Sequence, residues 1–289
     1  MLSTLRALLR AGVCSLAFMA AAQAAPVEAV HFDSLDGTEL TAWLALPPQM
    51  PPRGTVIALH GCGGLYATSG PRKGRLNARH QGMTDMLVAQ GYAVLLPDSL
   101  TPRGEHQICT QKIGSRHIDQ TQRRVDGLAA LDWVAAQPWA DARKIAVLGW
   151  SHGGTAVLSV TDAANTEVAR HANTNPGQFA VAIAFYPGCS AALRHHYQPG
   201  TRLVMQLGAD DDWTPPQPCI DLAHQVGAEV DVYPDSYHDF DNPIGTVRMR
   251  KDVPNGIHPG QGVHAGRNPE AAAQAWARVR EVLARAFQD

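Results

Sequence analysis

A serine between two glycines, in residues 149–153, is the part of the sequence best suited to chemistry. The segment reads Gly-Trp-Ser-His-Gly; it follows an apolar run at 145–148 and leads into a helical pattern from about Thr155. A G-x-S-x-G pattern between a strand and a helix is typical of a nucleophile elbow, a sharp turn that exposes the serine hydroxyl. Gly149 and Gly153 lack the β-carbons that would collide where strand and helix pass each other. Ser151 is therefore predicted to be a nucleophile, although in a chain with 26 glycines a chance match is the alternative.

Two later loops supply a base and an acid for this serine. A serine hydroxyl is a weak nucleophile unless a neighbouring base accepts its proton. In strand–turn–helix enzymes of this kind, the chain order is serine, acid, histidine, and Ser151, Asp211 and His238 follow that order. Adjacent carboxylates repel one another, so only one of Asp210, Asp211 and Asp212 should be buried against the imidazole. We favour Asp211 and expect the other two in solvent; for His238 the alternative is a loop histidine with no role.

Two backbone N–H groups are candidates for an oxyanion hole, which stabilises negative charge on a carbonyl oxygen during attack. One belongs to His152, directly after the nucleophile, and the other to Cys62 in the His-Gly-Cys-Gly-Gly run at 60–64. A plain tight turn is the alternative for this run. It lacks the glycine spacing of nucleotide-binding loops, and no H-E-x-x-H or C-x-x-C spacing occurs, so we expect neither a metal nor a cofactor.

Three aromatic residues near the expected strand ends are candidates for the substrate pocket. They are Trp213, Tyr186 and Trp150, and for Trp150 packing in the core is an equal alternative. Residues 242–268 are rich in glycine and proline and show no periodicity. This segment is predicted either to cover the site in part or to lie on the surface without a role.

The elements that must position these residues alternate between apolar strands and helices, which predicts a mostly parallel, doubly wound α/β sheet. Active sites in such sheets form at the carboxyl ends of the strands, and each motif above follows such an end. We find no repeat and no linker, and expect one domain over 25–289. The expected strands are 27–32, 40–46, 55–60, 92–98, 145–148, 181–185, 203–207 and 229–233, and the expected helices are 75–90, 119–137, 155–163, 218–226 and 269–287.

The amino terminus differs from the rest of the chain. Arg6 and Arg10 precede an apolar run at 11–22, and Ala-Gln-Ala at 22–24 matches a cleavage site. This is the pattern of a secretory signal peptide. The alternatives are a core helix or a membrane anchor, but the run is shorter than the ~20 residues that span a bilayer. Residues 1–24 are therefore predicted to be removed from a secreted or periplasmic protein.

Composition narrows the choice of partners. The net charge of −2 and the absence of a basic run exclude nucleic acid and anionic membranes as expected partners.

The cysteine count indicates disulfides. Of the five cysteines, one lies in the leader, and the even number that remains in an exported chain is typical of disulfides, with three possible connectivities. Four free thiols are the alternative. Cys62 and Cys109 follow two consecutive strands that we expect to be neighbours in the sheet, and Cys189 and Cys219 follow the next such pair. We therefore predict the pairs Cys62–Cys109 and Cys189–Cys219.

These residues together resemble the dienelactone hydrolase family of α/β-hydrolases, from about Val27 to the last helix. The resemblance implies an eight-stranded α/β-hydrolase sheet and a carboxylic-ester or lactone hydrolase. It also favours Asp211, because the family acid stands three residues after a glycine and four before a proline. The motifs that carry it are H-G-C-G-G at 60–64, L-P-D-S at 96–99 with P-R-G at 102–104, G-W-S-H-G-G at 149–154, Y-P-G-C at 186–189, G-x-x-D-D-W-T-P at 208–215 and Y-H-D-F at 237–240.

Two departures from the family affect the expected substrate. The founding members use a cysteine nucleophile and are intracellular enzymes of aromatic degradation, whereas this chain has Ser151 and an export signal. We therefore expect a general serine esterase, acting through an acyl-enzyme on a small-molecule ester or lactone, rather than a dienelactone hydrolase proper. Peptidase or acyltransferase action on the same residues is one alternative, and a catalytically silent binding protein is another.

Overall fold

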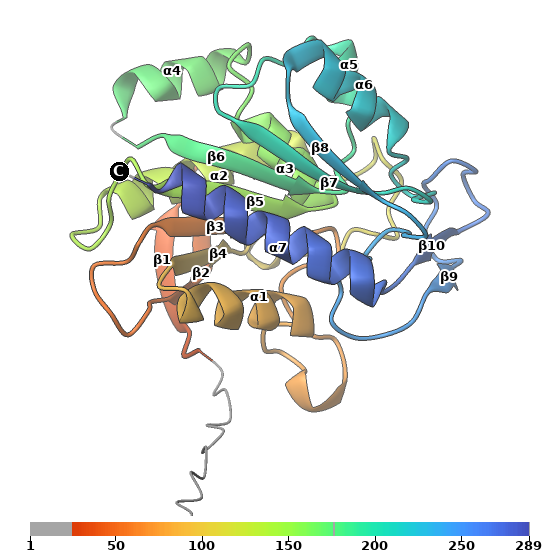
Figure 1. The fold of residues 1–289 in the computed structure, drawn as a ribbon, viewed down its shortest axis with the longest axis horizontal. Coiled ribbons are helices and arrows are strands. Elements are labelled where there is room, and N and C mark those ends of the chain that lie inside the picture. Colours follow the sequence, from red (N-terminus) through yellow and green to blue (C-terminus); the bar gives the residue numbers. More distant parts are fainter. Residues whose placement is uncertain (1–24, 176, 289) are drawn as a thin grey trace, which may run out of the picture.

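The computed structural model describes residues 25–175 and 177–288, so the expected signal peptide lies outside the described residues. An eight-stranded sheet with order β1-β2-β4-β3-β5-β6-β7-β8 forms its centre (Figure 1). The strands are β1 (Glu28–Asp33), β2 (Glu39–Ala45), β3 (Thr55–Leu59), β4 (Ala93–Pro97), β5 (Ile145–Trp150), β6 (Phe179–Phe185), β7 (Leu203–Gly208) and β8 (Glu229–Tyr233), with a separate hairpin of β9 (Arg248–Arg250) and β10 (Val263–Ala265). The helices are α1 (Ala78–Ala89), α2 (Gln120–Ala135), α3 (His152–Val160), α4 (Thr166–Thr174), α5 (Ser190–Arg194), α6 (Gln217–Val226) and α7 (Pro269–Ala286), with single 3₁₀ turns at Gly70–Arg72 and Thr101–Arg103.

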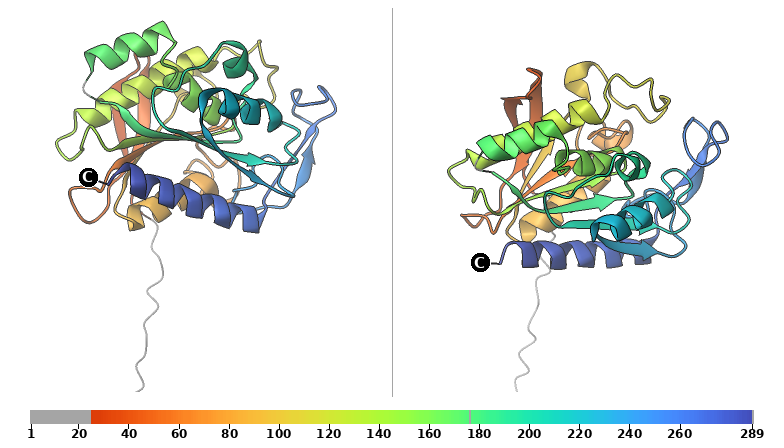
Figure 2. Two further views of the ribbon diagram at one scale, coloured as in Figure 1. Left: turned by 45° about the horizontal axis from the view of Figure 1, so that its top comes forward. Right: turned by 90° about the horizontal axis from the view of Figure 1, so that it is seen from above.

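The sheet is parallel from β4 to β8 and antiparallel at the β1–β2 edge. Strands β3, β4, β5 and β7 are buried along their whole length, as expected for parallel strands that helices cover on both faces. Helices α1 and α7 pack on one face, and α2, α3 and α6 pack on the other (Figure 2). Each face therefore has its own apolar layer, and the carboxyl ends of the strands meet at one edge.

Local sequence accounts for the helix that precedes the nucleophile. Asp119 caps α2, since its carboxylate accepts the N–H of Thr121, and the side chain of Gln122 accepts the N–H of Asp119 in return. This capping box fixes where the helix begins. The expected cap at Asp119 is present, although the helix ends two residues earlier than its apolar pattern indicated.

The short helices α4 and α5 and one hairpin were not expected from the sequence. Helix α4 has only Val168 and His171 in the core, so it lacks a long apolar stripe, and its start is set by Asn165, which accepts the N–H groups of Glu167 and Val168. Within residues 242–268, strands β9 and β10 form a hairpin of three residue pairs. These strands are too short to leave a period in the sequence.

Two disulfides join loops at the carboxyl edge, Cys62 to Cys109 and Cys189 to Cys219. Their Cα atoms are 4.9 and 5.0 Å apart, respectively. These are the two pairings expected from the strand order, because β3 lies beside β4 and β6 lies beside β7. Each disulfide therefore joins the segments that follow two neighbouring strands.

Candidate active site

Ser151 lies at the turn between β5 and α3. Its backbone has φ 53° and ψ −117°, and its N–H donates to the carbonyl of Phe185 on the neighbouring strand at 2.9 Å. This positive φ is rare for a residue with a side chain, and it holds the hydroxyl away from the strand. A β-carbon at Gly153 would stand 2.0 Å from the carbonyl oxygen of Leu59, so only glycine allows α3 to begin here.

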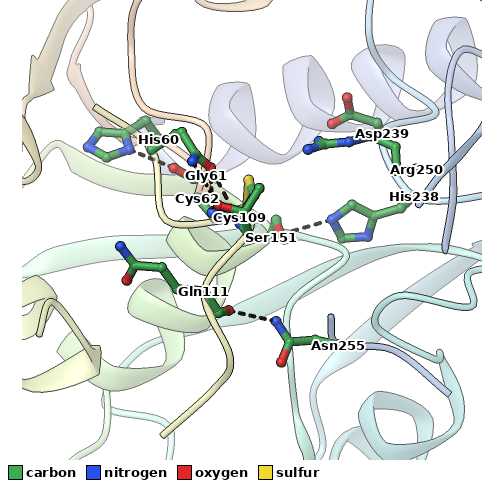
Figure 3. Close-up of a disulfide and its surroundings, with 12 residues drawn as sticks. His60, Gly61, Cys62, Cys109, Gln111, Ser151, His238, Asp239, Arg250 and Asn255 are labelled. Atoms are coloured by element: carbon green, nitrogen blue, oxygen red, sulfur yellow. Dashed lines mark hydrogen bonds between the residues drawn. A yellow bond between two sulfur atoms is a disulfide. The ribbon is translucent and has the colours of Figure 1, made fainter. Parts of the chain in front are cut away.

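His238 lies beside this hydroxyl and against Asp211. Its Nε2 is 2.8 Å from Oγ of Ser151 (Figure 3). Its Nδ1 is 2.7 Å from Oδ2 of Asp211. Because an ionised carboxylate only accepts hydrogen bonds, Nδ1 carries the imidazole proton, and Nε2 is free to accept the proton of the serine. His238 and Asp211 are almost fully buried, with exposed fractions of 1% and 2%.

The carboxylate of Asp211 is held by its own loop. Its Oδ1 accepts the N–H groups of Trp213 at 2.9 Å and Thr214 at 2.8 Å, and its Oδ2 accepts the hydroxyl of Thr214 at 3.0 Å. These three hydrogen bonds fix the orientation of the carboxylate and direct Oδ2 toward the imidazole.

The other two acids of this loop have different surroundings. Asp210 is exposed, as expected. Asp212 was expected in solvent, but it is only partly exposed and accepts both the backbone N–H of His264 at 2.8 Å and its Nδ1 at 2.7 Å. The hairpin that brings His264 to this acid forms only in the folded chain, which is why the sequence pattern did not indicate the pair.

A close approach of two loops places the acid beside the histidine. A β-carbon at Gly208, the last residue of β7, would lie 2.3 Å from the carbonyl oxygen of Ser236. The N–H of Asp210 donates to that same carbonyl at 3.0 Å. Glycine at this position therefore lets the loop after β7 lie directly against the loop that carries His238.

The His60–Gly64 loop lies over the nucleophile turn. A β-carbon at Gly61 would meet the carbonyl oxygen of Trp150 at 3.3 Å and the Cβ of Ser151 at 3.6 Å. Cys62 is fixed twice, since its carbonyl accepts the N–H of Ile108 at 2.8 Å and its sulfur is bonded to Cys109 (Figure 3). The backbone of Cys62 is thus held close to the serine.

Two buried histidines near this loop stay neutral. Burial, together with the charge of Arg123, lowers the pKa of His60 and of His152 well below the ordinary value. Nε2 of His60 accepts the N–H of Ser99 at 3.3 Å, so its proton is on Nδ1, which donates to the carbonyl of Gly61 at 2.8 Å. Burial also lowers the pKa of Arg123 to about 10, and its guanidinium donates to the carbonyl of His60 at 2.8 Å. These contacts hold the His60–Gly64 loop in place.

A cavity of about 930 Å³ opens beside Ser151 and His238. Trp213 lines it, and its ring centroid lies 4.5 Å from that of His238. Tyr186 and Trp150, the other pocket candidates, are fully buried and do not line the cavity. Residues 242–268 contribute part of the wall, and from this segment the guanidinium of Arg250 lies 5.5 Å from the Trp213 ring. This segment is therefore part of the candidate site.

Metal-ligating side chains do not gather in groups of three or more anywhere in the described residues. Within those same residues, none of the helices combines the length and the apolar character needed to cross a bilayer.

Comparison with known proteins identifies the family of the chain. The sequence profile of the Dienelactone hydrolase family matches residues 40–287. The chain belongs to the dienelactone hydrolase family. It is accordingly a hydrolase of ester bonds with the α/β-hydrolase fold. No curated protein matches the sequence.

Solved structures share the fold at low identity. A dienelactone hydrolase-like promiscuous phosphotriesterase from metagenomic libraries is 20% identical with a TM-score of 0.62, over 91% of this chain and 99% of its own. Esterase 2 of Thermogutta terrifontis, solved in a form phosphorylated by paraoxon, is 18% identical with a TM-score of 0.61, over 89% of this chain and 93% of its own. Both alignments cover most of this dienelactone hydrolase family member.

The sequence did not mark several residues around the site as functional. Arg79 comes from α1, and Arg250 comes from β9, both far from the recognised motifs. Asp239 and Asp241 flank Phe240 directly after the histidine. A run of acids beside a candidate catalytic histidine was the one available signal, and it did not show what the acids would contact.

Proposed function

We propose that this dienelactone hydrolase family member cleaves carboxylic esters or lactones with Ser151 as nucleophile, His238 as general base and acid, and Asp211 as the orienting acid. The observation that carries the proposal is the chain of contacts from Ser151 Oγ to His238 at 2.8 Å and from His238 to the buried Asp211 at 2.7 Å. A nucleophile within reach of a base, with the base oriented by a third group, is the arrangement that covalent catalysis by serine requires.

The steps follow from the positions of these groups. The hydroxyl of Ser151 attacks the ester carbonyl while Nε2 of His238 takes its proton, and the resulting imidazolium is stabilised by Asp211. The N–H groups of Cys62 and His152 donate to the oxyanion. His238 then protonates the leaving alcohol, and water cleaves the acyl-enzyme by the same proton transfers in reverse.

Trp213 is proposed to contact the substrate, since it lines the cavity next to His238. Tyr186, the other expected contact, supports the imidazole from the buried side instead, with ring centroids 4.5 Å apart. The family membership favours ester hydrolysis over the alternatives of peptidase action, acyl transfer or a silent binding role.

Replacement of the serine tests the proposal directly. Ser151→Ala should lower kcat on p-nitrophenyl acetate by about 10⁴-fold or more, because it removes the attacking atom. Ser69→Ala is the matched control, because Ser69 also lines the cavity and belongs neither to the nucleophile turn nor to the loops that carry Asp211 and His238. Paraoxon should add one diethylphosphoryl group, on Ser151, as detected by mass spectrometry of the intact protein and its peptides. Wild-type turnover in Ser151→Ala would refute the assignment.

We further propose that the chain is exported, with residues 1–24 as the signal peptide and 25–289 as one domain. Two disulfides support export, because such bonds persist in oxidising compartments. The small-molecule ester or lactone is then met in the periplasm or outside the cell.

A further inference from the structure

The loop after His238 carries two acids that the proposed mechanism does not use. Asp239 is partly exposed and forms an ion pair with Arg79. Phe240 is fully buried in the apolar layer under α7, and the side chain of Asp241 is completely excluded from solvent. A buried carboxylate costs stability unless charge and hydrogen bonds compensate for its lost water. The partners of Asp241 therefore show why an acid is placed here.

Asp241 accepts hydrogen bonds from two elements of the sheet. Its Oδ2 accepts the indole N–H of Trp150, at the end of β5, at 2.8 Å. Its Oδ1 accepts the hydroxyl of Tyr186, which directly follows β6. The guanidinium of Arg79 supplies the countercharge, with Nε 3.4 Å from Oδ2. One carboxylate thus links β5, β6 and α1 to the histidine loop.

Both hydrogen-bond donors adjoin reacting groups. Trp150 directly precedes Ser151, so its indole is anchored at the base of the nucleophile turn. The ring of Tyr186 packs against His238, and its backbone has a φ of 36°. Positive φ at both Ser151 and Tyr186 is unfavourable by itself and persists only where the surroundings hold it. The two bonds to Asp241 are such a constraint.

We propose that Asp241, supported by Arg79, is a positioning residue that sets the separation between Oγ of Ser151 and Nε2 of His238. The proposal rests on the proposed function of that pair. The two atoms belong to loops more than eighty residues apart in the chain, at a sequence separation of 87. Asp241 lies three residues after His238 and accepts the indole N–H of Trp150, which directly precedes Ser151. It therefore connects the two loops. Misplacement of a reacting group by about 1 Å can cost on the order of 10²-fold in rate.

Asp241→Asn tests the role with little change in shape. The amide has one acceptor oxygen for two donors, and it removes the charge opposite Arg79. We expect kcat on p-nitrophenyl acetate, and the rate constant for phosphorylation of Ser151 by paraoxon, to fall by about 10²-fold with KM little changed. Asp126→Asn is the matched control, because Asp126 is equally buried and binds Arg103 and Ser34 away from Ser151 and His238. It should lower Tm while leaving kcat unchanged.

Tyr186→Phe provides a second measurement. It keeps the ring against His238 and removes only the hydroxyl that Asp241 accepts. It should lower the phosphorylation rate in the same direction, and the double variant should be no slower than Asp241→Asn alone, because both changes break one link. If Asp241→Asn does not fold, the phosphorylation rate of Tyr186→Phe tests the positioning role of Asp241 instead.

Three results would overturn the role of Asp241. They are wild-type rates in a folded Asp241→Asn or Tyr186→Phe protein, an equal loss of kcat in Asp126→Asn, or multiplicative losses in the double variant. Ser151→Ala separates this from the proposed function. If Ser151→Ala is inactive and Asp241→Asn is fully active, only the positioning role fails; if Ser151→Ala keeps turnover, the assignment of the site itself fails.

Discussion

Three consecutive acids show how the surroundings of a residue decide its role. Asp210 is exposed, Asp211 is held by its own loop against His238, and Asp212 binds His264. The side chains are identical, so composition could not separate them. The backbone N–H groups of Trp213 and Thr214 both donate to Asp211 and orient its carboxylate.

Asp211→Asn should lower kcat by about 10⁴-fold, since an amide no longer holds the imidazole in the tautomer that leaves Nε2 free to accept a proton. Steady-state kinetics on p-nitrophenyl acetate measure the change. Asp210→Asn is the control within the same tripeptide and should be indistinguishable from wild type. A larger loss in Asp210→Asn or Asp212→Asn than in Asp211→Asn would assign the acid elsewhere.

The loops at the carboxyl edge of the sheet carry the site, and two disulfides limit their movement. Cys62–Cys109 joins the loop after β3, with its proposed oxyanion donor, to the loop after β4. Cys189–Cys219 joins the end of the β6 loop to α6. We therefore expect the first disulfide to affect catalysis and the second to affect stability alone.

Cys109→Ser should lower both stability and kcat. Loss of either disulfide should reduce the free energy of unfolding by about 3–4 kcal/mol, because each closes a loop of tens of residues. Only Cys109→Ser should also reduce kcat, since it frees the backbone of Cys62. Denaturant melts and ester kinetics on Cys109→Ser and Cys219→Ser compare the two. Equal retention of kcat in both variants would show that the oxyanion loop does not need the disulfide.

Buried histidines make stability depend on pH. In α1, burial and the neighbouring charge of Arg79 lower the pKa of His80 to about 3. The unfolded chain, with an imidazole pKa of about 6.5, binds the proton first, so this group lowers the free energy of unfolding by about 1.4 kcal/mol per pH unit as pH falls from about 6.5 toward 3. Stability should therefore be highest above pH 6.5 in this window.

Melts between pH 4 and pH 8 measure the slope. His80→Asn should give a shallower slope because it removes the contribution of one imidazole, while His60 and His152, whose pKa values are also lowered, retain theirs. A slope unchanged by His80→Asn would mean that the folded and unfolded states bind the His80 proton equally, so that burial does not lower its pKa.

At the scale of the whole molecule, residues 242–268 hold three loops of the site together. His264 binds Asp212, the carbonyl of His238 accepts the N–H of Gly266 at 2.8 Å, and the side chain of Asn255 binds the carbonyl of Gln111 at 2.9 Å (Figure 3). The segment thus connects the acid loop, the histidine loop and the loop of Cys109. Its glycines and prolines prevent long regular structure but do not prevent these contacts.

Export should leave Ala25 as the first residue of the mature protein. The backbone N of Ala25 lies 2.7 Å from Oδ1 of Asp85 on α1, so cleavage before Ala25 would place a charged amine beside a carboxylate. Amino-terminal sequencing of protein from the periplasm or medium tests the cleavage site, and thiol titration should find no free cysteine. An intact leader on the protein, or four titratable thiols after export, would contradict the prediction.

Much of the fold and most of the candidate site followed from local sequence. Buried parallel strands require continuous apolar runs, and a nucleophile turn requires small residues at fixed spacing. Both features can therefore be recognised in the sequence. The order of Ser151, Asp211 and His238, and the positions of the four cysteines after neighbouring strands, follow from the same regularity of the sheet.

The tertiary structure alone decided which side chains support that site. The placement of Asp241 between Trp150 and Tyr186, the burial of Tyr186 behind His238, and the pairing of His264 with Asp212 join residues from distant parts of the chain. Such contacts depend on how loops fold over one another. No local spacing predicts these contacts, because the sequence does not show whether an aspartate will be exposed to solvent or buried in the core.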